Sequence, residues 1–156
     1  MPIQNPKIAD FLVDVANLLE LDSASPFRVR AYRNAADTVR HLRPDLAGMV
    51  EAGDDLTELE GIGGAIADKI EEIVRTGHLA YLDELAKGPP GPLLALLRVP
   101  GLGPGRVRAL REALGIQSIP DLEAALQAGQ VRGIPGFGAK SESSLIETLA
   151  TLDRDS

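Results

Sequence analysis

The sequence predicts an all-α protein assembled from short helices. Its apolar residues recur with a period near 3.6, and no segment alternates apolar and polar residues for long enough to indicate a strand. Prolines and glycines interrupt this pattern at short intervals, which favours many brief helices. Because only 3% of the residues are aromatic and none is tryptophan, the core must consist mainly of leucine, isoleucine, valine and alanine.

Five helices are expected in the first half of the chain. The first begins where Asn5 can cap a helix and Pro6 can occupy its first position. Ser25 and Pro26 repeat this start signal for a second helix, which carries a cluster of arginines. The other three are a short helix after Pro44 that ends near Gly53, and two helices that flank Gly77, over 64–75 and 78–87.

A run of glycine and proline then divides the chain. The segment Gly88-Pro89-Pro90-Gly91-Pro92 cannot be helical and is typical of a linker. We therefore expect two subdomains, over residues 1–88 and 89–156. The second contains four further helices, near 93–98, 105–114, 121–128 and 139–152.

The composition excludes several kinds of protein. A chain without cysteine has no disulfide, thiolate zinc site or cysteine nucleophile, and two histidines are too few for a histidine-rich metal site. No apolar run is long enough to span a bilayer and no signal pattern opens the chain, so we expect a cytoplasmic protein without membrane contact. The net charge of −7 disfavours nucleic acid, but the positive charge is concentrated within residues 26–43, 91–111 and 131–140.

Three segments share one pattern, in which a hydrophobic residue, any residue, glycine, a second hydrophobic residue and a second glycine follow one another. Their first glycines are 40 and 35 residues apart, and each segment lies between two expected helices. The repeated unit is thus helix, glycine turn, helix. The segments are Leu59-Glu60-Gly61-Ile62-Gly63, Val99-Pro100-Gly101-Leu102-Gly103 and Ile134-Pro135-Gly136-Phe137-Gly138.

Such a unit is suited to binding phosphate. Glycine tolerates positive φ and lets a ligand approach the backbone closely, because no Cβ is in the way. The turn also brings the N-terminus of its second helix to the surface, with unpaired N–H groups and the positive end of the helix dipole. The alternative is a helical hairpin whose glycines only turn the corner. Three copies, two of them followed by Arg106, Arg108 or Lys140, favour phosphate binding.

These turns resemble the helix-hairpin-helix motif of DNA-binding and repair proteins. The order of features resembles the N-terminal part of family X DNA polymerases, the family of DNA polymerase beta and its bacterial relatives. The segment Phe27-Arg28-Val29-Arg30-Ala31-Tyr32-Arg33-Asn34-Ala35-Ala36 is similar to the family's second helix, and residues 61–70 to the first hairpin of its lyase domain. Residues 99–103 are similar to the hairpin of the following, fingers-type subdomain, and 122–150 continue with a third hairpin, as in bacterial members.

The resemblance implies that the hairpins hold the backbone of gapped or nicked DNA, or its 5′-phosphate ends, without reading bases. The first hairpin would contact the downstream strand and the second the primer side. The residues expected at this interface are Arg28, Arg30, Arg33, Gly61, Gly63, Gly64, Gly101, Gly103, Gly105, Arg106, Arg108, Gly136, Gly138 and Lys140.

A K⁺ or Na⁺ ion at the hairpins is also implied by the resemblance, bridging turn carbonyls to a phosphate oxygen, and no other cofactor is expected. The carbonyls that match the family's are those of Thr57, Leu59 and Ile62 in the first hairpin and of Leu97, Val99 and Leu102 in the second.

The family's lyase lysine, which forms a Schiff base with C1′ of an abasic 5′-phosphate end, falls on Lys69. The family tyrosine near the 5′-phosphate falls on Tyr32. Such a lysine must lose its proton to react, which neighbouring cations favour, and Arg28 and Arg30 supply them if the second helix packs alongside.

The same region also departs from the family. Lysines that help to cradle the 5′-phosphate fall on Ala65 and Tyr81. Lys69 is alternatively an ordinary solvated lysine beside Asp68 and Glu72. The resemblance therefore implies at most a weak lyase.

Three functions remain open from the sequence. The first, and the one we favour, is a sequence-independent DNA-binding module that acts as a monomer in repair. The second is a 5′-deoxyribose phosphate lyase that uses Lys69. The third is a protein-interaction scaffold whose hairpins no longer bind DNA. No polymerase active site is expected, because no strand-rich segment follows residue 150 to hold metal-binding carboxylates, and Asp153-Arg154-Asp155 is expected to be a frayed terminus.

Overall fold

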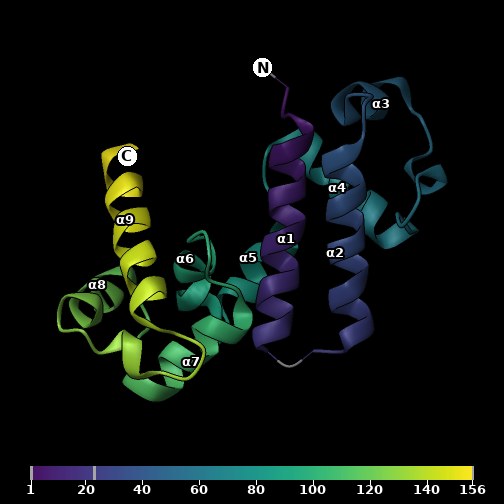
Figure 1. Ribbon diagram of the computed structural model, residues 1–156. Coiled ribbons are helices and arrows are strands. Elements are labelled where there is room, and N and C mark those ends of the chain that lie inside the picture. The colour runs from purple at the N-terminus through teal and green to yellow at the C-terminus, as the bar shows by residue number, and fades with distance from the viewer. Residues whose placement is uncertain (1, 23, 156) are drawn as a thin grey trace. The chain divides into compact units, whose positions relative to one another are not determined.

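The computed structural model describes residues 2–22 and 24–155, and within these ranges all regular structure is helical. The all-α prediction is confirmed. The chain packs as two units, Met1–Gly88 and Pro89–Ser156, which we call the N-terminal unit and the C-terminal unit (Figure 1). None of the helices in the described ranges combines the length and apolar character needed to cross a bilayer.

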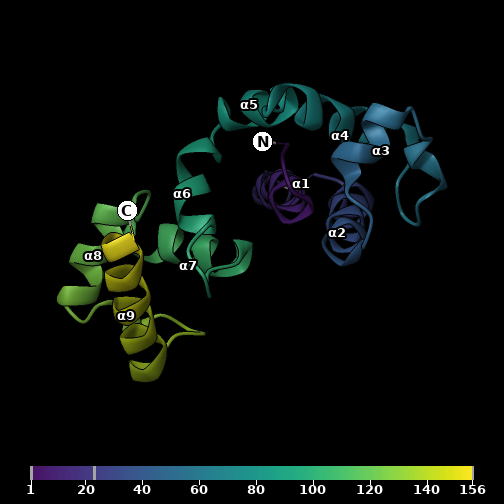
Figure 2. The same ribbon diagram turned by 90° about the horizontal axis from the view of Figure 1, so that it is seen from above.

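The N-terminal unit is organised around an antiparallel pair of helices, α1 (Asn5–Leu21) and α2 (Pro26–His41), which lie side by side in both views (Figures 1 and 2). Their facing stripes are almost fully buried, and each such side chain stabilises the fold by about 1.5–3 kcal/mol. Ion pairs Arg33–Glu20 (2.8 Å) and Arg40–Asp10 (3.0 Å) join the two helices at the surface. The buried residues of α1 and α2 include Ile8, Leu12, Val15, Leu19, Val29, Tyr32, Ala36 and Val39.

The rest of this unit comprises α3 (Leu46–Ala52), the 3₁₀ turn η1 (Leu56–Glu58), α4 (Gly64–Thr76) and α5 (Ala80–Ala86). Both α4 and α5 contact α1, through buried side chains that include Ile70, Ile73 and Leu82. This packing brings residues of α2, α4 and α5 into contact with one another.

The predicted N-cap residue is confirmed for the second helix and wrong for the first. At α2, Ser25 Oγ accepts a hydrogen bond from Phe27 N, as expected of an N-cap serine. At α1 the prediction is wrong, because the N-cap residue is Gln4 and Asn5 lies inside the helix. The Asn5 side chain is buried and fixes the α2–α3 connection, since its Nδ2 donates to Leu42 O (3.3 Å) and Pro44 O (2.8 Å) and its Oδ1 accepts from Leu46 N (2.9 Å).

The C-terminal unit contains η2 (Gly91–Leu93), α6 (Leu94–Leu97), α7 (Pro104–Leu114), α8 (Ile119–Gln127), η3 (Val131–Gly133) and α9 (Ala139–Asp155). Leu96, Leu110 and Leu122 are fully buried in its core.

Two local predictions about this unit are wrong. Gly91 and Pro92 open a 3₁₀ turn although their run was expected to be non-helical, because proline is tolerated in the first turn of a helix. The backbone of 153–155 continues α9 rather than fraying, while the side chains of Asp153, Arg154 and Asp155 lie outside the described residues.

Candidate nucleic-acid interface

The three glycine turns fold alike, which their shared pattern predicts. In each, the carbonyl of the first hydrophobic residue accepts a hydrogen bond from the N–H of the second, three positions later, and closes a β-turn. The second hydrophobic residue is then buried, between 4% and 9% exposed, and anchors the turn. The closing bonds are Ile62 N to Leu59 O (3.2 Å), Leu102 N to Val99 O (3.0 Å) and Phe137 N to Ile134 O (2.9 Å).

The first glycine of each turn adopts positive φ, at +77° in Gly61, +92° in Gly101 and +90° in Gly136. This conformation is costly for any residue with a Cβ. The closing hydrogen bond and the positive φ at the third position are typical of a type II turn, which also accommodates Pro100 and Pro135 at its second position. The turn geometry therefore requires these three glycines.

The second glycine of each turn does not adopt positive φ. Gly63 and Gly103 have φ of −86° and −96° and are extended N-cap residues. A Cβ built on Gly63, Gly64, Gly103, Gly105 or Gly138 would meet no atom of the protein within 4 Å. Neither backbone conformation nor internal packing therefore demands glycine at these positions.

Each second glycine begins a helix whose first N–H groups lack partners within the helix. Its carbonyl accepts the first helical bond, from Ala67 N in α4 (2.8 Å) and from Val107 N in α7 (3.0 Å). Because they are glycines, Gly63 and Gly103 have no side chain that could cap the N–H groups in the first turn of the helix that follows. The exposed N-termini of α4 and α7 are thus electropositive and accessible to an anion.

The two turns of the C-terminal unit are joined by Arg106. Its Nη1 donates to Gly101 O (3.2 Å), its Nη2 lies 3.5 Å from Gly136 O, and its guanidinium carbon lies 5.1 Å from the centre of the Phe137 ring. Arg106 therefore holds the second and third turns in a fixed relation while its charge stays at the surface. Lys140, in the first turn of α9, is exposed.

The turn in the N-terminal unit has different surroundings. Its second position is Glu60, an exposed acid, where the other two turns have proline. Thr38 Oγ1 donates to Glu60 O (2.9 Å) and fixes this turn to α2. The carboxylate of Asp55 accepts bonds from Thr57 Oγ1 (2.6 Å) and N (3.0 Å), and these hydrogen bonds lower the pKa of Asp55.

Of the backbone carbonyls expected to hold a monovalent cation, those of Leu59, Ile62, Val99 and Leu102 lie in the turns, whereas Thr57 lies in η1 and Leu97 ends α6. The carbonyls of Leu59 and Val99 each accept one hydrogen bond within their turn, and a carbonyl oxygen retains a second lone pair for a ligand.

Arg28, Tyr32, Lys69 and Tyr81 form a cluster at one end of the N-terminal unit. Tyr32 is buried, and its ring stacks on that of Tyr81 with centres 6.2 Å apart and planes 23° from parallel. Arg28 Nη2 donates a hydrogen bond to Tyr81 Oη, and Lys69 Nζ lies 4.8 Å from the centre of the Tyr81 ring. Burial raises the pKa of Tyr32, with the nearby charge of Arg28 acting in the opposite direction. The candidate lyase residues Lys69 and Tyr32 thus both contact Tyr81.

Arg30 and Arg33, also on α2, make different contacts. Arg33 is paired with Glu20, and the guanidinium of Arg30 lies 5.4 Å from the ring centre of Phe27. Phe27 is 77% exposed, which is unusual for a phenylalanine, and the sequence analysis did not single it out. The signal available in the sequence was its position directly after Ser25-Pro26, which start a helix with four arginines.

A second feature that the sequence analysis missed is the buried carboxylate of Glu142 in the third hairpin. Its Oε1 accepts bonds from Arg132 Nη2 (2.7 Å) and Nε (3.1 Å), and its Oε2 accepts from Arg132 N (3.0 Å). These hydrogen bonds lower the pKa of Glu142 below its usual value. Glu142 occupies the repeat position of Ala67 and Val107, so the pair replaces an apolar core contact and joins η3 to α9.

Comparison with known proteins agrees with this geometry. Residues 3–79 match the helix-hairpin-helix domain family, and residues 93–151 match the SAM-like helix-hairpin-helix tandem family. The chain is therefore a helix-hairpin-helix protein, a class that binds DNA. It is also 34% identical, over 142 residues and 91% of its length, to the DNA polymerase/3′-5′ exonuclease PolX of Bacillus subtilis (strain 168).

The chain is thus related to the family X DNA polymerases and corresponds to their N-terminal region. It spans 24% of the length of the Bacillus protein. The resemblance given by the turns and by the second helix is confirmed.

Proposed function

We propose that this protein binds gapped or nicked DNA without sequence preference, as a monomer in the cytoplasm, and that its hairpin turns contact backbone phosphates. One observation carries the proposal: the second glycine of each turn is required by nothing inside the protein. Close approach of an external group explains it, because a Cβ would separate the helix N-terminus from a phosphate oxygen. Hairpins that only turned a corner would need the first glycine alone.

The C-terminal unit supplies the larger share of the affinity in this proposal. Its turns have Arg106 and Lys140 beside them, whereas the turn of the N-terminal unit has the exposed acid Glu60. A monovalent cation held by the carbonyls of Thr57, Leu59 and Ile62 would offset that acid and bridge to a phosphate. The exposed ring of Phe27 is a surface on which an unpaired base at the gap would stack, beside the guanidinium of Arg30.

Fluorescence anisotropy tests the proposal with labelled gapped, nicked and intact duplexes of several unrelated sequences. We expect gapped and nicked DNA to bind more tightly than intact duplex, and equally across sequences. The logarithm of the affinity should fall with the logarithm of the salt concentration, by about 0.9 for each phosphate neutralised. Lys140→Ala should reduce this slope by about one. Lys7→Ala, which removes an exposed lysine outside the hairpins, is the matched control. A salt-independent affinity or a strong sequence preference contradicts the proposal.

A second function is favoured by the cluster around Lys69. There, Lys69 acts as the nucleophile of a 5′-deoxyribose phosphate lyase, and Arg28 and Tyr32 bind the 5′-phosphate. The neutral Lys69 amine attacks the C1′ aldehyde of the opened sugar, a C–N bond forms, and water leaves. A base removes a proton from C2′ and the C3′–O bond breaks, which releases the downstream strand with its 5′-phosphate. Water then hydrolyses the imine and restores the amine.

Borohydride trapping on a 5′-incised abasic duplex tests this second function. We expect a weak covalent adduct with the parent protein and none with Lys69→Ala, while Lys7→Ala behaves as the parent. Arginine cannot replace Lys69, because a guanidinium stays protonated at neutral pH. An adduct that survives in Lys69→Ala would place the chemistry on another amine, and the absence of an adduct in every protein would leave DNA binding alone.

A further inference from the structure

We propose that Tyr81 is a cover over the Lys69 amine and that it controls the access of aldehydes to this amine. Tyr81 contacts Arg28, Tyr32 and Lys69, which come from two other helices. The inference deepens the proposed lyase function and rests on it for its biological consequence. Its physical content, the access to one amine, is measurable without DNA.

The cover is held from three directions. Arg28 donates a hydrogen bond to the Tyr81 hydroxyl, the buried ring of Tyr32 stacks against the Tyr81 ring, and Lys69 Nζ lies 4.8 Å from the centre of that ring. A cation above an aromatic ring at this distance is attracted to the ring face. Arg28 and Tyr32 belong to α2, Lys69 to α4 and Tyr81 to α5, so the cluster depends on how these three helices meet.

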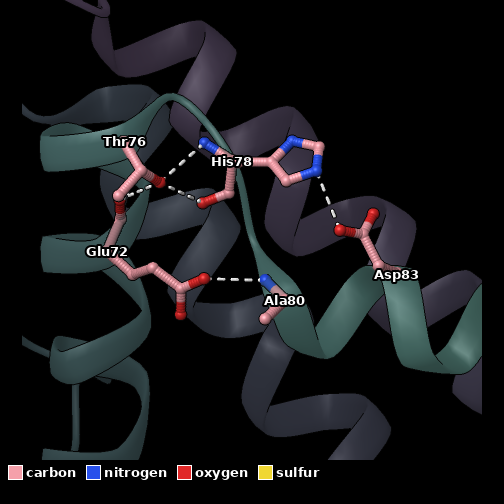
Figure 3. A network of polar contacts seen from close by, with 5 residues as sticks. All are labelled: Glu72, Thr76, His78, Ala80 and Asp83. Carbon is pink, nitrogen blue, oxygen red and sulfur yellow. Dashed lines mark hydrogen bonds and ion pairs between the residues drawn. The ribbon is translucent and has the colours of Figure 1, made fainter.

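The position of Tyr81 is fixed by the junction of α4 with α5, shown in Figure 3. Glu72 Oε2 accepts a hydrogen bond from Ala80 N (2.7 Å), so a residue of α4 caps the helix that carries Tyr81. Thr76 Oγ1 donates to the carbonyl of Glu72 (2.8 Å) and accepts from His78 N (3.1 Å), which holds the connection. His78 Nε2 lies 2.8 Å from Asp83 Oδ2 and closes the first turn of α5.

The covering ring has a chemical consequence. A C–N bond forms only when an aldehyde carbon reaches the lone pair of the amine nitrogen, and the Tyr81 ring occupies one face of that nitrogen. While the contact holds, an aldehyde cannot approach the nitrogen from the side of the ring. A cation–π contact is worth about 0.5–2 kcal/mol, which corresponds to an about two- to thirtyfold reduction in the exposed population of the amine. The Tyr81 ring thus reduces the access of an aldehyde to the nucleophile.

The test measures acylation of individual lysines in the free protein, by mass spectrometry after short exposure to an N-hydroxysuccinimide ester. We expect Tyr81→Leu to raise the rate at Lys69 about two- to thirtyfold. The rates at Lys7, Lys87 and Lys140 in the same sample serve as internal references and should not change. Glu84→Ala, an exposed substitution on α5, is the matched control for general loosening of this helix.

A second variant separates the ring from its hydroxyl. Tyr81→Phe keeps the ring over Lys69 and removes the hydrogen bond from Arg28, so we expect a smaller increase at Lys69 than with Tyr81→Leu. This variant also serves if Tyr81→Leu unfolds the unit, which circular dichroism would reveal. An unchanged rate at Lys69 in folded Tyr81→Leu, or an equal rise at all lysines, overturns the proposal.

Borohydride trapping then distinguishes the cover from the lyase function. Faster trapping in Tyr81→Leu than in the parent supports both. Faster acylation of Lys69 with no trapping in any variant supports the cover and refutes the lyase. Faster acylation with slower trapping overturns the controlling role, because Tyr81 would then assist the reaction instead of restricting it.

Discussion

The two glycines of the second hairpin provide a matched pair of substitutions, Gly101→Ala and Gly103→Ala. Gly101 has φ of +92°, a conformation that an L-residue rarely adopts, whereas Gly103 is extended at −96°. A Cβ at either position would meet no atom of the protein within 4 Å, so packing contributes to neither effect. Any difference between their effects on folding therefore comes from the backbone, through the positive φ at Gly101 and the N-cap position of Gly103.

The expected magnitudes follow from that difference. Gly101→Ala should destabilise the C-terminal unit by about 1–3 kcal/mol, the range for a residue forced into a sparsely populated conformation. At Gly103, alanine reduces the entropy of the unfolded chain and so stabilises by about 0.4–1 kcal/mol. Alanine is also a poorer N-cap residue than glycine, which costs a similar amount. We therefore expect Gly103→Ala to change the free energy of unfolding by less than about 0.5 kcal/mol.

Urea denaturation followed by circular dichroism measures the free energy of unfolding, and anisotropy with gapped DNA measures binding. The distinguishing result is expected from Gly103→Ala, which should keep the stability of the parent and lose affinity, because its methyl group stands where a phosphate would approach. Equal destabilisation by the two substitutions would refute the assignment of strain to the first glycine alone. Full affinity in a stable Gly103→Ala would refute phosphate contact at this turn.

Two further predictions concern residues outside the turns. Asn5→Ala should destabilise the N-terminal unit by about 1–3 kcal/mol in urea denaturation, because it leaves Leu46 N without its side-chain partner in a buried site; an unchanged midpoint would contradict this role. The pKa of Glu142 is lowered, so its pair with Arg132 stabilises the fold fully above the usual carboxyl pKa of 4.5. This contribution is lost as the pH falls through the lowered pKa of Glu142. Glu142→Gln should therefore be less stable than the parent at pH 7, with a difference that shrinks in acid; a pH-independent difference would disprove the linkage.

Much of the fold could be predicted because the start and stop signals of the helices are local. Ser25 caps α2 through its own neighbours, and Gly53 and Gly77 end their helices with positive φ. Asn5 shows where such reasoning fails. An asparagine before Pro6 has the pattern of a cap, but its partners are 37 to 41 residues away, and no local pattern contains that information.

The part of the candidate site that could be predicted from the sequence is the set of three repeated turns. The three turns have one geometry because backbone conformation at glycine and proline is set by the residues themselves. The cluster around Tyr81 was not predictable, because it requires α2, α4 and α5 to meet at one end of the unit. The resemblance matches the position of Tyr81 to a lysine of the family. The sequence could not show that the Tyr81 ring would lie over Lys69.

If the hairpin turns themselves touch DNA, their backbone amides must respond when DNA binds. A titration of ¹⁵N-labelled protein with gapped DNA, followed by amide chemical shifts, tests this contact most directly, since each turn contributes glycine amides of its own. We expect the largest changes at the starts of α4, α7 and α9, in residues 61–65, 101–106 and 136–140, and the same residues should respond to unrelated DNA sequences. Changes confined to other surfaces, with these amides unmoved at saturation, would contradict contact between the turns and DNA.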